Sequence, residues 1–299
     1  MTSLTKKLFL SLFSVAAAVC LAVGIFALPV QKSSALSADI VTLNDIGDFD
    51  IEGTVLSGLS STGAGKIGGK PYEVVIPESV TAISANAFAA STSNATALES
   101  VTVPAGVTSI GERAFAGQRG LLVINFNATA CNDFAAGNTN PFYNAGLSVD
   151  GGITVNIGAV NKLPANMFNG GSTTGNTVNV GAVNFNGASI AAGNFGAYAF
   201  AYNRNLKTVN FSNTSIEEIG SYACFNTAVG VIAIPDEVKT IKNNAFANSS
   251  LSNLQFTNNS TLAIIEENAF TSSKVGVVGI PEGVTSIGAN AFLNCAALT

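Results

Sequence analysis

The sequence predicts an α/β solenoid, with a parallel β-sheet on one face and short helical turns on the other. The first observation is a block that recurs along the chain: Ile-Pro, then Val, then Ile, then Ala-Phe, as in residues 76–88 and 280–292. The second observation is a short β-like run before many of these blocks. A single block cannot bury its own apolar face, so the copies must stack on one another.

The position of the phenylalanine gives about nine repeats. Neighbouring copies lie between 22 residues (Phe270 to Phe292) and 32 residues (Phe168 to Phe200) apart. Nine copies exceed the roughly three that a stable solenoid needs. The register positions are Phe88, Phe115, Phe142, Phe168, Phe200, Cys224, Phe246, Phe270 and Phe292.

Each part of the repeat predicts an element. Aliphatic residues five and eight positions before the phenylalanine predict two buried columns, and alternation in runs such as residues 121–126 predicts strands with one buried face. Proline closes a strand where no further N–H is needed. A small alanine before the phenylalanine predicts a turn packed close to the sheet. Asparagine two positions before the phenylalanine predicts a structural turn residue, as at Asn86, Asn140, Asn166, Asn244, Asn268 and Asn290.

The outward position of each strand carries a neutral polar residue, and this row is the candidate binding surface. Neighbouring strands lie about 4.8 Å apart, so the row should be continuous on the exposed face. The alternative interpretation is a solvated strand face without a ligand. The row has no Trp, Tyr or Arg, which predicts weak or multivalent binding, or a site on inserted loops. The candidate residues are Thr102, Asn125, Asn156, Asn179, Asn210 and Gln255.

Composition argues against an enzyme. The chain has no histidine, the commonest general base and metal ligand. Adjacent carboxylates at residues 217–218 and 266–267 are interpreted as solvated turns. The acidic run at residues 48–53 imitates the first half of a calcium loop, but Leu59 stands where the last ligand would be, which favours an acidic cap loop. A net charge of −5 disfavours nucleic acid as a partner. The sequence therefore predicts no catalytic site, no metal and no cofactor.

Three segments are expected. Residues 1–38 carry a basic start, an apolar run and small residues at the end, which predicts a cleaved secretory signal; a retained signal anchor is the alternative. Residues 39–73 are predicted to be an N-terminal cap or a degenerate repeat. Residues 74–299 form the predicted solenoid. It is expected to be truncated at the C-terminus, because Leu298 lies where the next strand would begin. The mature chain is then secreted or on the cell surface, without a membrane span.

The last copy resembles the BspA type of leucine-rich repeat. It reads Ile-Pro-Glu-Gly-Val-Thr-Ser-Ile-Gly-Ala-Asn-Ala-Phe-Leu-Asn-Cys over residues 280–295, and the resemblance covers about residues 71–299. The copies between Gly120 and Asn205 depart most, because they lack Ile-Pro and carry inserts rich in Asn and Gly. The resemblance implies a leucine-rich-repeat solenoid and no shared catalytic residues. It also implies a surface protein of the kind that includes adhesins for host matrix proteins such as fibronectin and fibrinogen.

The function that follows as an expectation is an exported cell-surface binding protein, adhesin-like, with an extracellular or host matrix protein as its partner. A structural spacer or stalk that presents a further C-terminal domain is the alternative. The repeats set the shape of the surface, whereas the ligand depends on variable surface residues that follow no general code.

Overall fold

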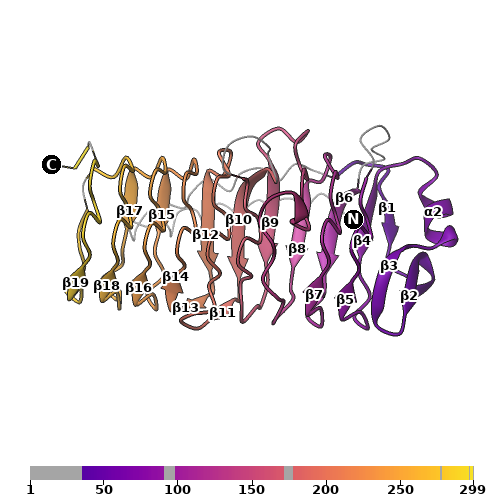
Figure 1. Ribbon diagram of the computed structural model, residues 1–299, viewed down its shortest axis with the longest axis horizontal. Coiled ribbons are helices and arrows are strands. Elements are labelled where there is room, and N and C mark those ends of the chain that lie inside the picture. The colour runs from indigo at the N-terminus through magenta and orange to yellow at the C-terminus, as the bar shows by residue number, and fades with distance from the viewer. Residues whose placement is uncertain (1–35, 91–97, 172–177, 277, 296, 299) are drawn as a thin grey trace, which may run out of the picture. The chain divides into compact units, whose positions relative to one another are not determined.

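The chain folds into a parallel-stranded β-solenoid with few helices (Figure 1). The computed structural model describes residues 36–90, 98–171, 178–276, 278–295 and 297–298. The predicted secretory signal therefore lies, apart from residues 36–38, outside the described residues. Among the residues described, no helix is long and apolar enough to cross a membrane.

One side of the solenoid is a ladder of parallel strands. Seven strands of the described chain form a sheet in the order β1-β4-β6-β8-β9-β10-β12, and a separate pair, β15 and β17, follows in the later repeats. Within each of these two sheets, neighbouring strands come from successive repeats and pair in parallel, as the stacked-repeat prediction requires. Their bounds are β1 Val41–Leu43, β4 Tyr72–Val75, β6 Leu98–Val103, β8 Val123–Phe126, β9 Ile153–Ile157, β10 Val180–Asn186, β12 Thr208–Ser212, β15 Val231–Ala233 and β17 Asn253–Gln255.

A second ladder of very short strands follows the prolines. Most of its strands carry a residue of one of the two predicted aliphatic columns, for example Ile241 beside Ile265 and Ile265 beside Ile287. Both columns are buried along most of the solenoid. The strands are β2 Phe49–Glu52, β3 Val55–Leu59, β5 Ala82–Ile83, β7 Ser109–Ile110, β11 Ser189–Ile190, β13 Ser215–Ile216, β14 Glu218–Ile219, β16 Thr240–Ile241, β18 Ile264–Ile265 and β19 Ser286–Ile287.

The third side consists of hydrogen-bonded turns rather than helices. Helical segments elsewhere in the described chain are α2 (Ser61–Ile67) and the 3-10 helices η1 (Ile46–Asp48) and η2 (Gly137–Thr139). The predicted short helical turns around Ala-Phe are present as turns such as Ala247 N–H to Asn244 O, 3.2 Å. A left-handed residue in the middle of each turn, such as Asn244 at φ 56°, prevents a helix from continuing.

Asparagine suits this left-handed position. The residue two positions before the phenylalanine has positive φ in eight of the nine repeats, as at Asn86, Arg113, Asn166, Tyr198, Tyr222, Asn244, Asn268 and Asn290. Asn140 is the exception. It is fully buried, and its Nδ2 donates to Asn166 O over 2.8 Å. The predicted structural role of these asparagines thus comes mainly from backbone conformation, because Asn tolerates left-handed φ better than most residues.

The phenylalanines form the predicted stack inside the solenoid. Ring centroids lie 5.3 Å apart for Phe88 and Phe115, 5.2 Å for Phe115 and Phe142, and 5.2 Å for Phe142 and Phe168. Backbone hydrogen bonds also join the repeats at the stack; for example, Phe115 N–H donates to Pro141 O over 2.8 Å. Burial of each ring contributes about 2–3 kcal/mol. Cys224 replaces one ring and is buried, as the sequence predicts.

A buried polar column lies three positions after the phenylalanine. These side chains bond the carbonyl of a stacked residue: Gln118 Nε2 donates to Phe88 O over 2.7 Å, and Ser249 Oγ donates to Phe246 O over 2.7 Å. Thr227 Oγ1 bonds Cys224 O in the same way, over 2.9 Å. The column provides hydrogen bonds to carbonyls of the tight turns inside the core.

Residues 39–73 begin the solenoid differently from the later repeats. Strand β1 pairs with β4 at the edge of the long ladder, while β2 runs antiparallel to β3. Asp48 is fully buried beside Lys66 of α2, with Oδ1 and Nζ 2.6 Å apart. Burial alone would raise the pKa of Asp48, but hydrogen bonds from Lys66 and the Asp45 backbone hold it below its ordinary value. A capping role for this segment stays a prediction.

We expect Phe142→Ala to lower the free energy of unfolding by about 3–5 kcal/mol, because it leaves a cavity between Phe115 and Phe168. Urea denaturation measures the loss. Phe292→Ala is the matched control: Phe292 is only half-buried, so its loss should be clearly smaller. Equal losses in the two variants would contradict a stabilising role for the continuous stack.

A second prediction concerns the left-handed turn residue Asn244. Asn244→Gly should keep the unfolding free energy within about 0.5 kcal/mol, whereas Asn244→Val should lose about 1–2 kcal/mol, since a β-branched residue is strained at positive φ. Both variants are measured by urea denaturation. If glycine cost as much as valine, side-chain contacts rather than backbone conformation would hold the turn.

Candidate binding surface

The outward row exists, with one correction. The strand register places Thr102 beside Asn125, and Asn125 beside Asn156. The next two partners are Asn184 on β10 and Asn210 on β12. Asn179, which the sequence analysis placed in the row, precedes β10 and does not belong to it; Asn184 takes its place.

Two similar triplets explain the error. Residues 178–180 read Val-Asn-Val and residues 183–185 read Val-Asn-Phe, so both alternate like a strand with an outward asparagine. The register shifts between Val180 and Ala182, and only the second triplet continues the ladder. A sequence signal nonetheless distinguishes the second triplet, because its asparagine stands before a phenylalanine. Asn125 and Asn210 also stand before a phenylalanine, in Ile-Asn-Phe and Val-Asn-Phe.

The central residues of the row form a one-directional amide ladder. Asn125 Nδ2 donates to Thr102 Oγ1 over 3.1 Å, and Asn156 Nδ2 donates to Asn125 Oδ1 over 2.8 Å. Asn184 Nδ2 then donates to Asn156 Oδ1 over 3.1 Å. Each amide carries two N–H donors and two acceptor lone pairs, so every ladder asparagine retains bonding capacity for a ligand.

The row is interrupted after β12, in the later repeats. Strand β12 is the last strand of the seven-stranded sheet, and Gln255 lies in the separate pair, where its register partner is Ala233. Val75 precedes Thr102 at the other end and is exposed. Of the six predicted residues, Thr102, Asn125, Asn156 and Asn210 therefore share one sheet face, Gln255 continues it across a break, and Asn179 lies elsewhere.

The sheet face between β6 and β12 is neutral. A second row lies two positions before the first on the same sheet face, and its registered members are Ser100, Val123, Thr154, Ala182 and Thr208. Ser100 and Ala182 of this row are buried. Neither row carries a charged side chain across these strands. A surface of this kind recognises a ligand through hydrogen bonds and shape, with little electrostatic steering of the approach.

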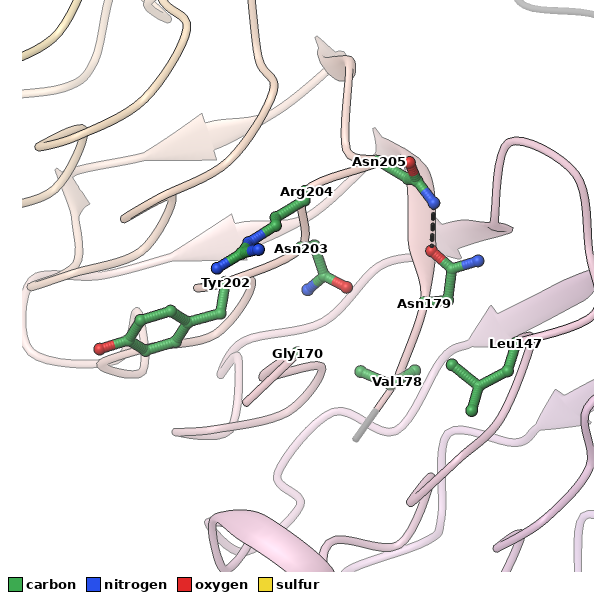
Figure 2. A pocket seen from close by; sticks show the side chains of 8 residues that line it. All are labelled: Leu147, Gly170, Val178, Asn179, Tyr202, Asn203, Arg204 and Asn205. Carbon is green, nitrogen blue, oxygen red and sulfur yellow. Dashed lines mark hydrogen bonds between the residues drawn. The ribbon is translucent and has the colours of Figure 1, made fainter. Parts of the chain in front are cut away.

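Asn179 instead lines a pocket of about 310 Å³ beside the long ladder (Figure 2). Its Nδ2 donates to Gly146 O over 3.1 Å, and its Oδ1 accepts from Asn205 Nδ2 over 2.9 Å, the bond drawn in Figure 2. The neighbouring Asn203 is buried; it bonds Phe200 O over 3.0 Å and accepts from Val180 N–H over 2.9 Å. These amides hold the inserted segments in place, so Asn179 has a structural role.

One carboxylate of each adjacent pair is ion-paired between repeats, whereas Glu218 lies on β14 and is buried, so the prediction of a solvated turn is wrong at that residue. Lys239 Nζ lies 3.0 Å from Glu217 Oε1, and this hydrogen bond lowers the pKa of Glu217. Lys242 Nζ lies 2.9 Å from Glu266 Oε1, and this hydrogen bond raises the pKa of Lys242. These pairs join neighbouring strands of the short ladder; they do not converge on a cleft.

The remaining reactive groups are inaccessible or dispersed. Cys131 and Cys224 are buried, and burial raises the pKa of each thiol to about 12. Such thiols are poor nucleophiles because little thiolate forms near neutral pH. Within the described ranges, no group of three or more His, Cys, Asp or Glu side chains could hold a metal ion. Asp50 and Glu52 of the half calcium loop lie on strand β2.

Comparison with known families gives a match over more than half of the chain. A family model described as the BspA type leucine-rich repeat region matches in six copies, over residues 70–137 and 181–299. The stretch between the two matched regions, residues 138–180, lies within the part that departs most from the repeat pattern. The solenoid nevertheless continues through it, because β9 joins β8 to β10 and Phe142 and Phe168 stay in the stack. No curated protein matches the sequence significantly.

Three solved structures of leucine-rich repeat proteins match the chain at low sequence identity. One is a leucine-rich cell surface protein from Faecalibacterium prausnitzii, 18% identical with a TM-score of 0.34; the match covers 86% of this chain and 53% of that one. Another, from Eubacterium ventriosum, is 21% identical with a TM-score of 0.32, and 76% and 58% are covered. A third, from Bacteroides ovatus, is 16% identical with a TM-score of 0.30, and 84% and 91% are covered. The chain thus spans little more than half of the first two.

We expect Asn156→Ala to lower the unfolding free energy by about 1–2 kcal/mol, because it removes one ladder bond on each side. Asn210→Ala, at an exposed position of the same row, is the matched control and should change stability by no more than about 0.5 kcal/mol. Urea denaturation compares the two. Equal effects would show that the amide ladder contributes nothing measurable.

Proposed function

Because the chain belongs to the BspA-type leucine-rich repeat family, we propose that it is an exported cell-surface protein that binds extracellular protein through the surface of its solenoid. The proposed partner is an extracellular or host matrix protein, and the proposed role is adhesin-like. Solenoids generally bind along extended surfaces built from equivalent positions of successive repeats. Function on a shared fold resides in such surface positions rather than in the fold itself.

One observation carries this proposal: a neutral, polar, in-register row extends across five strands, from Thr102 on β6 to Asn210 on β12. The strands hold these side chains at regular spacing on a rigid sheet, which lowers the entropy lost on binding. The ladder asparagines present both donors and acceptors to a partner. The proposed binding residues are Thr102, Asn125, Asn156, Asn184, Asn210 and Gln255.

The proposal of export rests on the N-terminal sequence. Lys6 and Lys7 precede an apolar run that ends in small residues near Ala38, the pattern of a secretory signal. Amino-terminal sequencing of the chain from the culture medium or cell envelope tests this part. A new N-terminus near Asp39 would support cleavage, and an intact Met1 would contradict it.

The binding test uses the purified chain and immobilised fibronectin, fibrinogen and collagen, at low and at physiological salt. Saturable binding that changes little with salt would support the proposal, because the sheet face between β6 and β12 is uncharged. If a folded sample bound none of the three proteins, the result would contradict protein binding and favour the alternative function, a spacer that presents another domain.

We expect the double variant Thr102→Lys with Asn210→Lys to weaken binding to the captured protein by about tenfold or more, because it places a charge at each end of the neutral row. Surface plasmon resonance measures the change. Asn258→Lys, exposed in the turn between β17 and β18, is the matched control and should bind like the wild type. Unchanged binding by the double variant would place the contact surface elsewhere.

A further inference from the structure

Three tyrosines occupy left-handed backbone positions that most repeats give to asparagine. Tyr198 and Tyr222 stand two positions before their register residues, at φ 58° and 55°, and Tyr202 stands two positions after Phe200, at φ 64°. The position two residues after the register residue, which Tyr202 occupies, carries asparagine in other repeats, at Asn144, Asn226, Asn248 and Asn294. A bulky side chain at positive φ carries a backbone cost that asparagine largely avoids. Backbone strain of this kind, at a position where asparagine would be less strained, is typical of functional positions.

These tyrosines gather with Phe225 into a half-exposed aromatic cluster on the turn side of two neighbouring repeats. The rings of Tyr198 and Tyr222 stack with centroids 4.4 Å apart and planes 9° apart. Phe225 packs edge-on against Tyr202, at 5.3 Å, and against Tyr222, at 5.4 Å. The contacts fix the orientation of the rings, so they present a preformed aromatic surface.

A pocket of about 420 Å³ lies beside this cluster. It is lined by Tyr198 and Tyr202, by Asn166 and Asn169, and by the small residues Ala136, Gly137 and Gly171. The volume falls in the range of about 300–1,000 Å³ that small-molecule sites occupy. Asn166 Nδ2 donates to Phe134 O over 3.2 Å, which fixes the amide at the pocket wall. An asparagine amide has a second N–H and a second lone pair, so Asn166 can hold the turn and also bond a ligand.

From this juxtaposition of tyrosine rings and asparagine amides, we propose that the pocket beside Tyr198 and Tyr202 binds a neutral saccharide. A pyranose ring has a face of C–H groups, which packs on the negative face of an aromatic ring, and an edge of hydroxyl groups, which pairs with amides. The lining of the pocket provides both kinds of contact at one place.

The charge of the lining separates this ligand from other classes. Among the described residues that line the pocket, none is Lys, Arg, Asp or Glu. A phosphate, sulfate or carboxylate group bound there would lose its hydration without gaining an ionic partner. The proposal concerns the turn side, so it does not depend on protein binding by the long ladder.

The test titrates the purified chain with cellotetraose, maltotetraose, mannotetraose and chitotetraose. Three of the five tyrosines belong to the cluster and the chain has no tryptophan, so tyrosine emission reports mainly on the cluster. Saturation-transfer NMR identifies the sugar protons that contact the protein. We expect one of these neutral oligosaccharides to bind. We also expect Tyr198→Asn and Tyr202→Asn each to weaken its affinity about tenfold or more.

Asn replaces Tyr because it suits the left-handed backbone, so each variant should fold with an unchanged or higher urea midpoint. Asn248→Ser, at the equivalent turn position two repeats away, is the matched control and should bind like the wild type. Absence of binding by all four oligosaccharides would overturn the proposal, as would affinity unchanged in both tyrosine variants. Binding confined to sialylated or sulfated oligosaccharides, or loss of protein binding alone in the tyrosine variants, would also overturn it.

Discussion

The structure depends on one constraint: each repeat bonds and packs against the same set of positions in the next repeat. Phe246 N–H donates to Ala269 O, and Phe270 N–H donates to Ala291 O, each over 2.8 Å. On the long ladder the strands pair in the same way. Because the contacts recur, a position can hold only residues that tolerate the same backbone conformation and the same neighbours. The stacked rings, the left-handed turns and the buried polar column all follow from this constraint.

Much of the fold could be predicted because burial and chain reversal select residue types strongly. The aliphatic columns and the phenylalanine positions could be predicted because each repeat must bury the same surface. The spacing of the repeats was enough to assign Cys224 to a phenylalanine position. The turn side was less readable. Alanine before phenylalanine suggests a helical turn, but whether the backbone then enters the left-handed region depends on hydrogen bonds between repeats, such as Asn244 N–H to Glu267 O. Sequence patterns report such bonds poorly.

The candidate surface was predictable only in part. Alternation identifies an outward residue within a strand, yet it cannot reveal a register shift such as the one between Val180 and Ala182. That shift decides between Asn179 and Asn184. The aromatic cluster was missed for a different reason. Tyr198 and Tyr222 are 24 residues apart, and their significance appears only when the backbone conformation of both turns is known. Side chains from different repeats meet on the surface only if the number of residues between them fits the repeat, and inserts change that number.

The amide ladder gives the solenoid a direction. Every described ladder bond points the same way, from the asparagine of one repeat to the polar oxygen of the preceding repeat. Each asparagine therefore meets an equivalent partner on either side, whichever copy supplies it. Gene duplication or loss of a whole repeat would preserve both the hydrogen-bonding sense and the polar face. Length can then vary during evolution without redesign of the surface, and the number of equivalent contact positions varies in proportion.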